Sequence, residues 1–482
     1  MTKRIIGMIM AAALAVSLLP GAAVSAAAQD HKAAAPAENG QQETTPEQEA
    51  AAASAQSLPD LTGGSAVITL MWRTDAEDPE TQDPVWQWAQ GAFDTWEEKE
   101  NKELKLVPVK ESEQEWRAAL PERLGEGGEC PDLILGSTSH LPADAEAGLL
   151  TDLSAQAASY SAWDWFYDPL KDLSSAGNGV YGVPCGALAA GLWYDADRLA
   201  EAGVTDYDED SEEQEDWTPS SVGDLREACR LLQRQDRDLR YLDASGTLFY
   251  ELLLLSCGGR PVTAQGTWIT ESEPSAEAIA ALRDLYAEGY AFGPAGAQEE
   301  DAPSAAIIPG FVVPAQMADG ETGFAAMPAL SEAGAPVTVA EGTVLEIPEC
   351  APDKEAAWAF LCRMMEPECY LPYAVKTAAY GGLCVRTDLA QSEAFDGIPF
   401  YAARQALLSG AFVRPRTPLY TQISHCVLEM MEALEEDPSE DAAEAAAQAL
   451  RAGIEEAAGA ENCWPKADPE EDAAEEESAE EE

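Results

Sequence analysis

Basic residues are scarce in this chain of 482 residues. It has 28 lysines and arginines against 88 aspartates and glutamates, which gives a formal net charge of −60. A surface of that sign repels nucleic-acid phosphates and anionic lipid headgroups, so we expect no nucleic-acid partner. The same acidity suits a soluble, exported protein. Hydrophobic residues still make up 46% of the chain, which is enough to build a large core.

The chain also lacks the motifs of common hydrolases and zinc enzymes. Only His31, His140 and His425 occur, and no cysteine pair has C-x-x-C spacing, so a zinc site is not expected. No G-x-S-x-G or H-E-x-x-H sequence is present, which argues against a Ser-His-Asp hydrolase and a zinc protease. A glycosidase needs two positioned carboxylates, and among 88 acidic residues such a pair gives no signal. We therefore expect a protein with no enzyme activity, no cofactor and no metal.

Long apolar runs are missing except at the N-terminus. Lys3 and Arg4 precede the run IIGMIMAAALAVSLLPGAAV, and small residues follow it. This order predicts a secretory signal peptide over residues 1–27, with a retained membrane anchor as the alternative. The first cysteine is Cys130, so lipid attachment near the cleavage zone is not expected. We expect an exported protein that is extracellular, associated with the cell surface or periplasmic.

Three segments have too few apolar residues to form a core. Residues 28–64 are rich in Ala, Gln, Glu, Pro and Ser and predict a disordered linker. Residues 461–482 predict a solvated acidic tail, and TDYDEDSEEQED at 205–216 predicts an insertion in a surface loop. The ten cysteines invite disulfide bonds in an exported chain, but their spacing does not determine the pairing.

Between these segments, short β-rich runs alternate with amphipathic helical runs, which predicts an α/β fold. We expect strands at 65–72, 104–110 and 131–138, separated by helices at 84–101 and 112–127. This rhythm is typical of a doubly wound sheet, in which ligands bind at the carboxyl ends of the strands.

Several segments resemble, in their order along the chain, the extracellular solute-binding proteins of ABC importers. The similarity is to family 1, which includes maltodextrin- and multiple-sugar-binding proteins. Each motif alone is weak, and the shared order is what makes the resemblance specific. The matching segments are PDLIL (131–135), GLLTDLS (148–154), GVYGVPCGALAAGLWYDADRLAEAGV (179–204), DWTPSSVGDLREACRLLQ (216–233), LLLLSCGGR (252–260), SAEAIAALRDLYAEGY (275–290), GFAAMPAL (323–330), KEAAWAFLCRMMEPE (354–368) and VRPRTPLYTQIS (413–424).

The resemblance implies a two-lobed periplasmic-binding-protein-like fold of type II, with doubly wound sheets joined by a three-strand hinge. The first lobe would comprise residues 65–188 plus 329–382. The second lobe would comprise residues 192–325 plus 385–460. The chain would thus exchange lobes three times.

The stretch NGVYGVPCGALAAGLWYDADRLAEAGV, residues 178–204, contains the first of these exchanges. We expect residues 186–193 to pass between the two domains and to border a cleft, with an ordinary strand, turn and helix as the alternative. Asp195 is placed to cap the N-terminus of the helix that follows, and Gly203 is placed just past its end. Three glycines are expected to supply backbone freedom for the crossing: Gly182, Gly186 and Gly191.

A carbohydrate site combines aromatic faces with carboxylates, amides and arginines, because sugars present apolar C–H faces and hydroxyl groups. Trp72 ends the first strand, and Phe311 lies where the family often has a sugar-stacking aromatic. Glu341 precedes the glycine of a family segment that usually reads G-G-W, and this departure leaves the ligand type open. The candidate ligand-binding residues are Trp72, Arg73, Thr74, Ser137, Thr138, Tyr194, Tyr250, Phe311, Glu341, Tyr380 and Arg414.

Structural roles remain open for several of these candidates. Trp72 could cap the sheet as a core aromatic, and Phe311 could be a buried strand residue. Ser137 and Thr138 could form an ordinary turn, and Arg414 could belong to a structural ion pair. Four tryptophans at helical spacing are expected to pack in the core: Trp86, Trp88, Trp96 and Trp116.

We therefore expect an extracytoplasmic, monomeric solute-binding protein that captures a small ligand, a mono- or oligosaccharide, in an inter-lobe cleft. Hinge closure would then present the ligand to an ABC permease. The alternatives are a sensor or adhesion protein of the same fold, a binder of a cationic ligand such as a polyamine, and a secreted glycosidase.

Overall fold

The computed structural model describes residues 67–464, except for residues 97–101, 126, 129, 206, 209–212, 215, 238, 264–265, 299–304, 318–320, 331–333 and 418. The expected signal peptide and linker therefore lie outside the described residues. The chain divides into two compact units. Of the described residues, unit 1 comprises those within 67–167, 174–186 and 343–397, and unit 2 comprises those within 168–173, 187–342 and 398–464.

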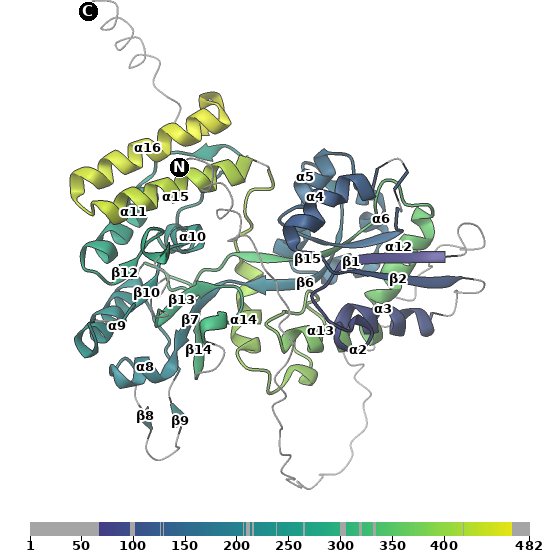
Figure 1. The fold of residues 1–482 in the computed structure, drawn as a ribbon, viewed down its shortest axis with the longest axis horizontal. Coiled ribbons are helices and arrows are strands. Elements are labelled where there is room, and N and C mark those ends of the chain that lie inside the picture. Colours follow the sequence, from purple (N-terminus) through teal and green to yellow (C-terminus); the bar gives the residue numbers. More distant parts are fainter. Residues whose placement is uncertain are drawn as a thin grey trace, which may run out of the picture. The chain divides into compact units, whose positions relative to one another are not determined.

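Unit 1 is built on a five-stranded sheet with the strand order β2-β1-β3-β15-β6 (Figure 1). Strands β2 and β3 both pair in parallel with β1, and β15 is antiparallel to β3. The first three strands and the first helices follow the expected alternation, which confirms the α/β prediction. The strand bounds are β1 Val67–Arg73, β2 Glu103–Val109, β3 Leu133–Ser137, β6 Val183–Ala189 and β15 Ala340–Glu346.

Helices cover both faces of this sheet; in Figure 1, α4 and α5 lie on one side of it and α2 and α3 on the other. Helix α4 begins at a capping box, in which the Ser112 side chain accepts from the Glu115 amide and the Glu115 carboxylate accepts from the Ser112 amide. Trp88, Trp96 and Trp116 are buried, as expected for packing residues. The helix bounds are α2 Pro79–Gln82, α3 Pro84–Asp94, α4 Glu113–Arg123, α5 Leu141–Glu146, α6 Ser154–Ser159, η1 Ser161–Trp165, α12 Lys354–Met364, α13 Pro367–Ala378 and η4 Glu393–Phe395.

A short hairpin and a disulfide complete unit 1. Strands β4 (Ser175–Ala176) and β5 (Gly179–Val180) form an antiparallel pair. Cys130 and Cys350 form a disulfide that joins the segment before β3 to the segment after β15, across 220 residues of sequence. Because β3 and β15 are antiparallel neighbours, this bond fastens the strand pair at one end, where β3 begins and β15 ends.

Unit 2 has its own five-stranded sheet, with the order β12-β10-β13-β7-β14. Strand β7 pairs antiparallel with both β13 and β14, whereas β10 pairs in parallel with β12 and β13. Its strand bounds are β7 Gly191–Asp195, β10 Leu242–Asp243, β12 Ala291–Phe292, β13 Ile307–Gly310 and β14 Thr322–Ala325.

The helices of unit 2 bury one continuous apolar core, which includes Leu192, Leu225, Leu253, Leu282 and Met431. Helices α15 and α16 run alongside each other at the edge of the unit (Figure 1). The bounds are α7 Asp168–Leu173, α8 Ala196–Glu201, α9 Val222–Gln235, α10 Thr247–Ser256, α11 Glu273–Ala287, η2 Gly296–Gln298, η3 Ala315–Met317, α14 Tyr401–Leu407, η5 Leu408–Gly410, α15 Leu419–Glu436, α16 Glu440–Ala458 and η6 Ala460–Asn462.

The stretch 178–204 forms β5, β6, β7 and α8, and the division between the units falls at residues 186 and 187, inside β6. Asp195 caps α8, because its carboxylate accepts from the Arg198 amide at 3.0 Å, and Gly203 follows the helix with a φ of +71°. Both capping predictions are confirmed.

The explanation expected for the glycines of this stretch is wrong. None of Gly182, Gly186 and Gly191 has a positive φ, so backbone freedom is not what their positions require. They are sites of close approach instead. A Cβ at Gly186 would lie 2.5 Å from the Thr343 hydroxyl oxygen, and one at Gly191 would lie 2.4 Å from the Phe324 ring.

The units also differ in extent from the expected lobes at the second and third exchanges. Residues 329–342 belong to unit 2, where the Val337 amide donates to Met327 and the Ala190 amide to Val339. Residues 385–397 belong to unit 1, where the Val385 amide donates to the Tyr370 hydroxyl at 3.1 Å.

Two further short segments depart from the expectation. Helix α7 belongs to unit 2, and its Leu173 carbonyl accepts from Arg416 at 2.7 Å. Cys463 and Trp464, at the start of the expected acidic tail, form β16, which pairs with β11 (Trp268–Ile269), and residues 465–482 lie outside the described residues. Part of the insertion at 205–216 pairs as the antiparallel strands β8 (Tyr207–Asp208) and β9 (Glu213–Gln214).

Candidate functional site

A buried charge cluster in unit 2 brings together side chains that are distant in sequence. The Arg414 guanidinium donates to the Glu251 carboxylate from Nε and Nη2, at 2.9 and 2.7 Å to Oε2. Its Nη1 pairs with Oε1 of Glu341. The Tyr420 hydroxyl donates to the other oxygen of Glu251. One guanidinium thus serves two carboxylates, and we call Glu251, Glu341, Arg414 and Tyr420 the acidic cluster.

Local structure explains why these groups meet. Glu251 is the one charged residue of α10, whose sequence TLFYELLLLS is otherwise almost wholly apolar. Phe412 lies beside β15, because its amide donates to Thr338 and its carbonyl accepts from the Ala340 amide. This pairing brings Arg414, two residues further on, next to Glu341 on β15.

Burial and charge act against each other in the acidic cluster. Glu341 is 3% exposed, and desolvation raises the pKa of its carboxyl to about 7, against the attraction of Arg414, which lowers it. Burial acts to lower the pKa of Arg414, but the two carboxylates outweigh it and raise that pKa. The Oε2 atom of Glu341 is buried and has no hydrogen-bond partner among the described residues. The cluster therefore holds a buried carboxylate oxygen whose hydrogen-bonding capacity is unused among the described residues.

Phe311 adjoins this cluster and is half-buried. The Arg414 guanidinium carbon lies 5.7 Å from the centre of the Phe311 ring. Residue Phe311 directly follows β13, and its carbonyl accepts from Nη2 of Arg404 at 2.6 Å. The structure thus brings together three of the sequence candidates: Phe311, Glu341 and Arg414.

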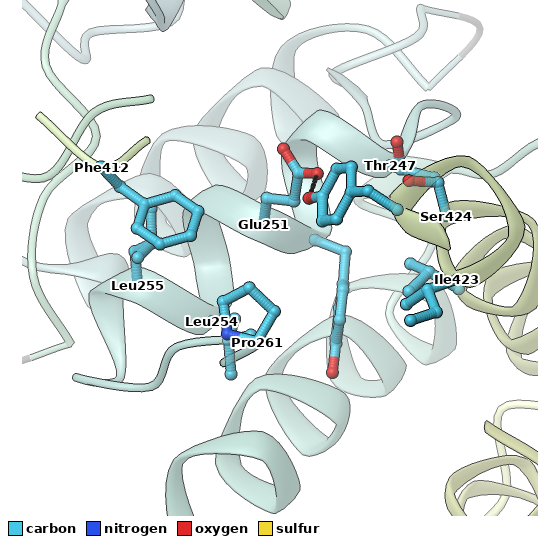
Figure 2. Close-up of a pocket in the computed structure, with 11 residues that line it drawn as sticks. Thr247, Glu251, Leu254, Leu255, Pro261, Phe412, Ile423 and Ser424 are labelled. Carbon is cyan, nitrogen blue, oxygen red and sulfur yellow. Dashed lines mark hydrogen bonds between the residues drawn. The ribbon is translucent and has the colours of Figure 1, made fainter. Parts of the chain in front are cut away.

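A small cavity lies between α10 and α15, and Glu251 and Tyr420 of the acidic cluster are among the residues that line it (Figure 2). Its volume is about 40 Å³, and mainly apolar side chains line it, including Leu254, Leu255, Phe412 and Ile423. A space of this size holds one or two waters, not a sugar. Tyr250 lines this cavity, and burial raises the pKa of its hydroxyl to about 12.

Tyr194 lies in the core of unit 2. It is 1% exposed, and its hydroxyl accepts from the Trp217 amide at 2.9 Å. Its ring meets the Trp217 ring edge-on, and Gly323 on β14 leaves room for it. These contacts give Tyr194 a packing role in the described structure.

In unit 1, Trp72 is enclosed beneath the end of β1. It is 1% exposed, and its indole Nε1 donates to the Asp83 carboxylate at 2.8 Å. Asp83 also caps α3 by accepting from the Val85 amide. The indole therefore fastens the strand end to the start of α3.

Four further candidates of unit 1 lie at or just after the carboxyl ends of two neighbouring parallel strands, β1 and β3. Arg73 pairs with Asp75 at 2.7 Å and with Glu113 at 3.0 Å. Thr74 is buried, and its hydroxyl accepts from the Ala76 amide. Ser137 shares a hydrogen bond of 2.8 Å with Ser139, and Thr138 is buried. These groups form a polar edge of the sheet.

Tyr380 is 50% exposed and follows α13. A larger hollow, of about 350 Å³, lies in unit 1 between α3 and α13, over the stacked rings of Trp88 and Tyr373. None of the sequence candidates lines it.

Sequence reasoning missed Glu251, Tyr420 and Arg404. A signal existed for Glu251, because a lone carboxylate in a run of leucines has to find a partner when the helix is buried. No comparable signal marks Tyr420 or Arg404, since each lies in an ordinary amphipathic helix. In the described part of the chain, no group of three side chains is placed to hold a metal ion. Nor does any described helix have the length and apolar character needed to cross a membrane.

Solved structures with the same fold cover most of the chain. The cyclic α-maltosyl-1,6-maltose binding protein of Arthrobacter globiformis is 20% identical, with a TM-score of 0.66, and the match covers 82% of this chain and 100% of that one. The GacH receptor of Streptomyces glaucescens, solved unliganded and with acarbose, is 17% identical, with a TM-score of 0.63 and coverage of 82% and 98%. The protein Lmo0181 of Listeria monocytogenes, solved with cycloalternan, is 15% identical, with a TM-score of 0.60 and coverage of 82% and 99%.

These likenesses confirm the expected fold class, an α/β two-lobed periplasmic-binding-protein-like fold. No curated protein matches the chain significantly in sequence. The profile of the family of bacterial extracellular solute-binding proteins matches residues 78–367, which is more than half of the chain. On this match, and with the fold in agreement, the chain belongs to the family of bacterial extracellular solute-binding proteins.

Proposed function

We propose that this chain is an exported carrier that binds a carbohydrate reversibly and delivers it to the permease of an ABC importer. Membership of the solute-binding family supports the binding role. Proteins of the same fold bind a cyclic maltosyl-maltose and cycloalternan, which supports a carbohydrate ligand. The capture is an equilibrium without chemical change, so the ligand is released intact.

The observation that carries this proposal is the meeting of Phe311 with the acidic cluster. A sugar ring stacks its C–H face on an aromatic ring, and its hydroxyls need strong acceptors and donors nearby. Phe311 provides the ring, and the guanidinium carbon of Arg414 lies 5.7 Å from the centre of that ring. The Oε2 of Glu341, which has no hydrogen-bond partner among the described residues, is the acceptor that we assign to a sugar hydroxyl.

In unit 1, we propose a second set of contacts from the polar edge formed by Arg73, Thr74, Ser137 and Thr138. These residues follow β1 and β3, at the strand ends where α/β sheets bind ligands. Arg73 is held by two carboxylates at 2.7 and 3.0 Å, which fixes its guanidinium in place.

One feature favours a second candidate, a cationic ligand such as a polyamine. The acidic cluster has two carboxylates for one guanidinium, and the chain as a whole carries a formal net charge of −60. A ligand ammonium group would compensate the surplus carboxylate. The negative charge of the whole chain would also attract such a cation from long range.

A thermal-shift screen separates the two candidates. The panel contains maltose, maltotriose, acarbose, glucose, spermidine and a set of amino acids. We expect stabilisation by a carbohydrate, since a ligand that binds only the folded state raises the melting temperature. Stabilisation by spermidine and by no carbohydrate would favour the cationic ligand. Stabilisation by no compound, or hydrolysis of the stabilising sugar on prolonged incubation, would contradict the proposed carrier.

Variants then locate the site. Phe311→Ala and Glu341→Gln should each weaken carbohydrate binding by about tenfold or more, because each removes about 1–2 kcal/mol of stacking or hydrogen bonding. Trp464→Ala serves as the matched control, since Trp464 is an exposed aromatic of the same unit outside the cluster. Equal affinities of wild type, Phe311→Ala and Glu341→Gln in calorimetry would place the site elsewhere.

Export is part of the proposal, and the Cys130–Cys350 disulfide supports it. Disulfides persist in oxidising compartments and are rare in the cytosol. Fractionation of cells that express the chain should recover it outside the cytoplasmic membrane, and recovery in the cytosol with reduced thiols would contradict export.

A further inference from the structure

Arg404 is a buried cation without a carboxylate partner in the described part of the chain. It lies on α14 and is 2% exposed. Burial lowers the pKa of its guanidinium to about 10. Its Nε has no hydrogen-bond partner among the described residues. The arginines Arg386 and Arg414, by contrast, each have carboxylate partners.

Aromatic rings and one main-chain carbonyl surround this guanidinium. Its central carbon lies 5.4 Å from the centre of the Trp193 ring and 5.8 Å from that of Phe324. Among the described residues, the guanidinium donates from Nη2 to the Phe311 carbonyl at 2.6 Å. The cation is thus held between rings and directed at the backbone of Phe311.

A gain in folding stability does not explain why the charged guanidinium of Arg404 is buried here. The removal of an ion from water is costly even after the protein relaxes around it. The ring contacts and the hydrogen bond offset only part of this cost. A neutral side chain of similar volume would therefore suit this apolar site about as well. What an apolar side chain of similar volume cannot do is donate a hydrogen bond to the Phe311 carbonyl.

Phe311 needs such an anchor because β13 ends at Gly310, one residue before it. Three contacts hold this strand end. The Trp193 indole Nε1 donates to the Gly310 carbonyl at 3.2 Å, Arg404 donates to the Phe311 carbonyl, and Arg414 lies over the Phe311 ring. Arg404 fixes the backbone, and Arg414 then meets the ring where that backbone places it.

We propose that Arg404 is a positioning residue for ligand binding: its buried guanidinium holds the backbone of Phe311 so that the ring is fixed for stacking on a carbohydrate. Arg404 itself does not touch the ligand. The carbohydrate ligand in this inference rests on the proposed function. The anchoring of the Phe311 backbone by Arg404 does not, and a separate experiment tests each part.

The first test needs no ligand. In Arg404→Met, amide hydrogen exchange of the segment 309–313 should rise by about tenfold, while exchange in β7 and β14 changes less than twofold. The matched control is Arg240→Met, since Arg240 also lies over a phenylalanine, Phe292 at 4.3 Å, and donates to a main-chain carbonyl, that of Gly296. Exchange that rises equally in 309–313, β7 and β14 would show a general packing role and would overturn the proposal.

The second test is a double-mutant cycle on the dissociation constant for maltotriose, measured by calorimetry. Arg404→Met should weaken binding about tenfold in the wild-type background and less than twofold in a Phe311→Ala background. Equal weakening in both backgrounds would overturn the positioning role. Should maltotriose and the other sugars fail to bind wild type, the proposed function fails, whereas the exchange experiment still decides whether Arg404 positions Phe311.

Discussion

At the scale of single residues, the acidic cluster is a compromise between burial and attraction. Glu341 is almost fully buried, yet it shares one guanidinium with Glu251. Desolvation outweighs the guanidinium, so the protonated carboxyl is favoured at a higher pH than in the unfolded chain. Ligand affinity and stability should both depend on this proton.

The first prediction concerns the pH dependence of stability. The pKa of Glu341 rises from 4.5 in the unfolded chain to about 7 in the folded one. Its contribution to stability is therefore complete below pH 4.5 and is lost as the pH rises toward 7. One pKa unit corresponds to about 1.4 kcal/mol. The wild type should therefore lose up to about 3 kcal/mol of unfolding free energy between pH 4.5 and 7, and Glu341→Gln should not show this loss.

Urea unfolding of wild type and Glu341→Gln at several pH values measures this difference. Glu436→Gln, on an exposed side chain of α15, provides the control for a simple loss of charge. Parallel pH profiles of wild type and Glu341→Gln would show that Glu341 does not titrate in this range.

The second prediction concerns the shared guanidinium. Arg414→Met leaves Glu251 and Glu341 buried without their common partner, which should cost about 3–5 kcal/mol of unfolding free energy. The triple variant Arg414→Met, Glu251→Gln, Glu341→Gln should recover most of that loss, because it removes the surplus charge. Chemical denaturation measures both, and a triple variant as unstable as Arg414→Met would mean that packing, not charge, explains the loss.

At the scale of elements, α14 begins at an unusual residue. Phe400 has a φ of +59°, and it is the one residue other than glycine with a positive φ in the described part of the chain. Its ring packs edge-on against Trp193, whose indole also anchors the end of β13. The ring at this strained helix start thus packs against Trp193, which is also one of the rings beside Arg404.

The third prediction measures that strain. Phe400→Gly should be more stable than Phe400→Ala by about 1 kcal/mol, because both lose the ring and glycine alone tolerates a left-handed backbone. Ala403→Gly is the control within the same helix, where glycine should be about 1 kcal/mol less stable than alanine. Equal stabilities of the two Phe400 variants in thermal unfolding would show that the backbone relaxes without cost.

At the scale of the whole molecule, the chain is two units that each contain a five-stranded sheet, and unit 1 has a covalent bond that unit 2 lacks among the described residues. The disulfide closes a very long loop of chain, which limits the freedom of the unfolded state. The stability of unit 1 should therefore depend on the redox conditions.

The fourth prediction follows from this bond. Replacement of Cys130 and Cys350 by serine should lower the unfolding free energy by about 2–5 kcal/mol. Dithiothreitol should lower the melting temperature of wild type and leave that of the double variant unchanged. Alkylation of the denatured, unreduced protein should modify eight of the ten cysteines, and modification of all ten would contradict the disulfide.

Much of the fold follows from local patterns in the sequence. The alternation of short β-rich runs and amphipathic helices gave the order of β1 to β3 and α3 to α4, and Asp195 and Gly203 marked the ends of α8. Helix bounds were less accurate, since α3 ends at Asp94 and not near residue 101. Local rules succeed here because caps and periodicity act within one or two turns of chain.

The site was only partly predictable. Glu341, Arg414 and Phe311 were expected from the resemblance, and they meet in unit 2. Their shared partner Glu251 and the anchor Arg404 were not expected, because their roles arise from contacts with residues more than ninety positions away. The ligand-binding roles of all the sequence candidates stay predictions.

The sequence by itself determined the fold class, the family and the ends of the early elements, because these depend on periodicity, on capping and on the order of motifs. Only the tertiary structure decided at which residues the chain passes between the units and which side chains form ion pairs. The second exchange lies in β15 and the third near residue 397, as long-range hydrogen bonds dictate. The pairing of Arg414 and the anchoring of Phe311 likewise require three-dimensional proximity, which no spacing along the chain encodes.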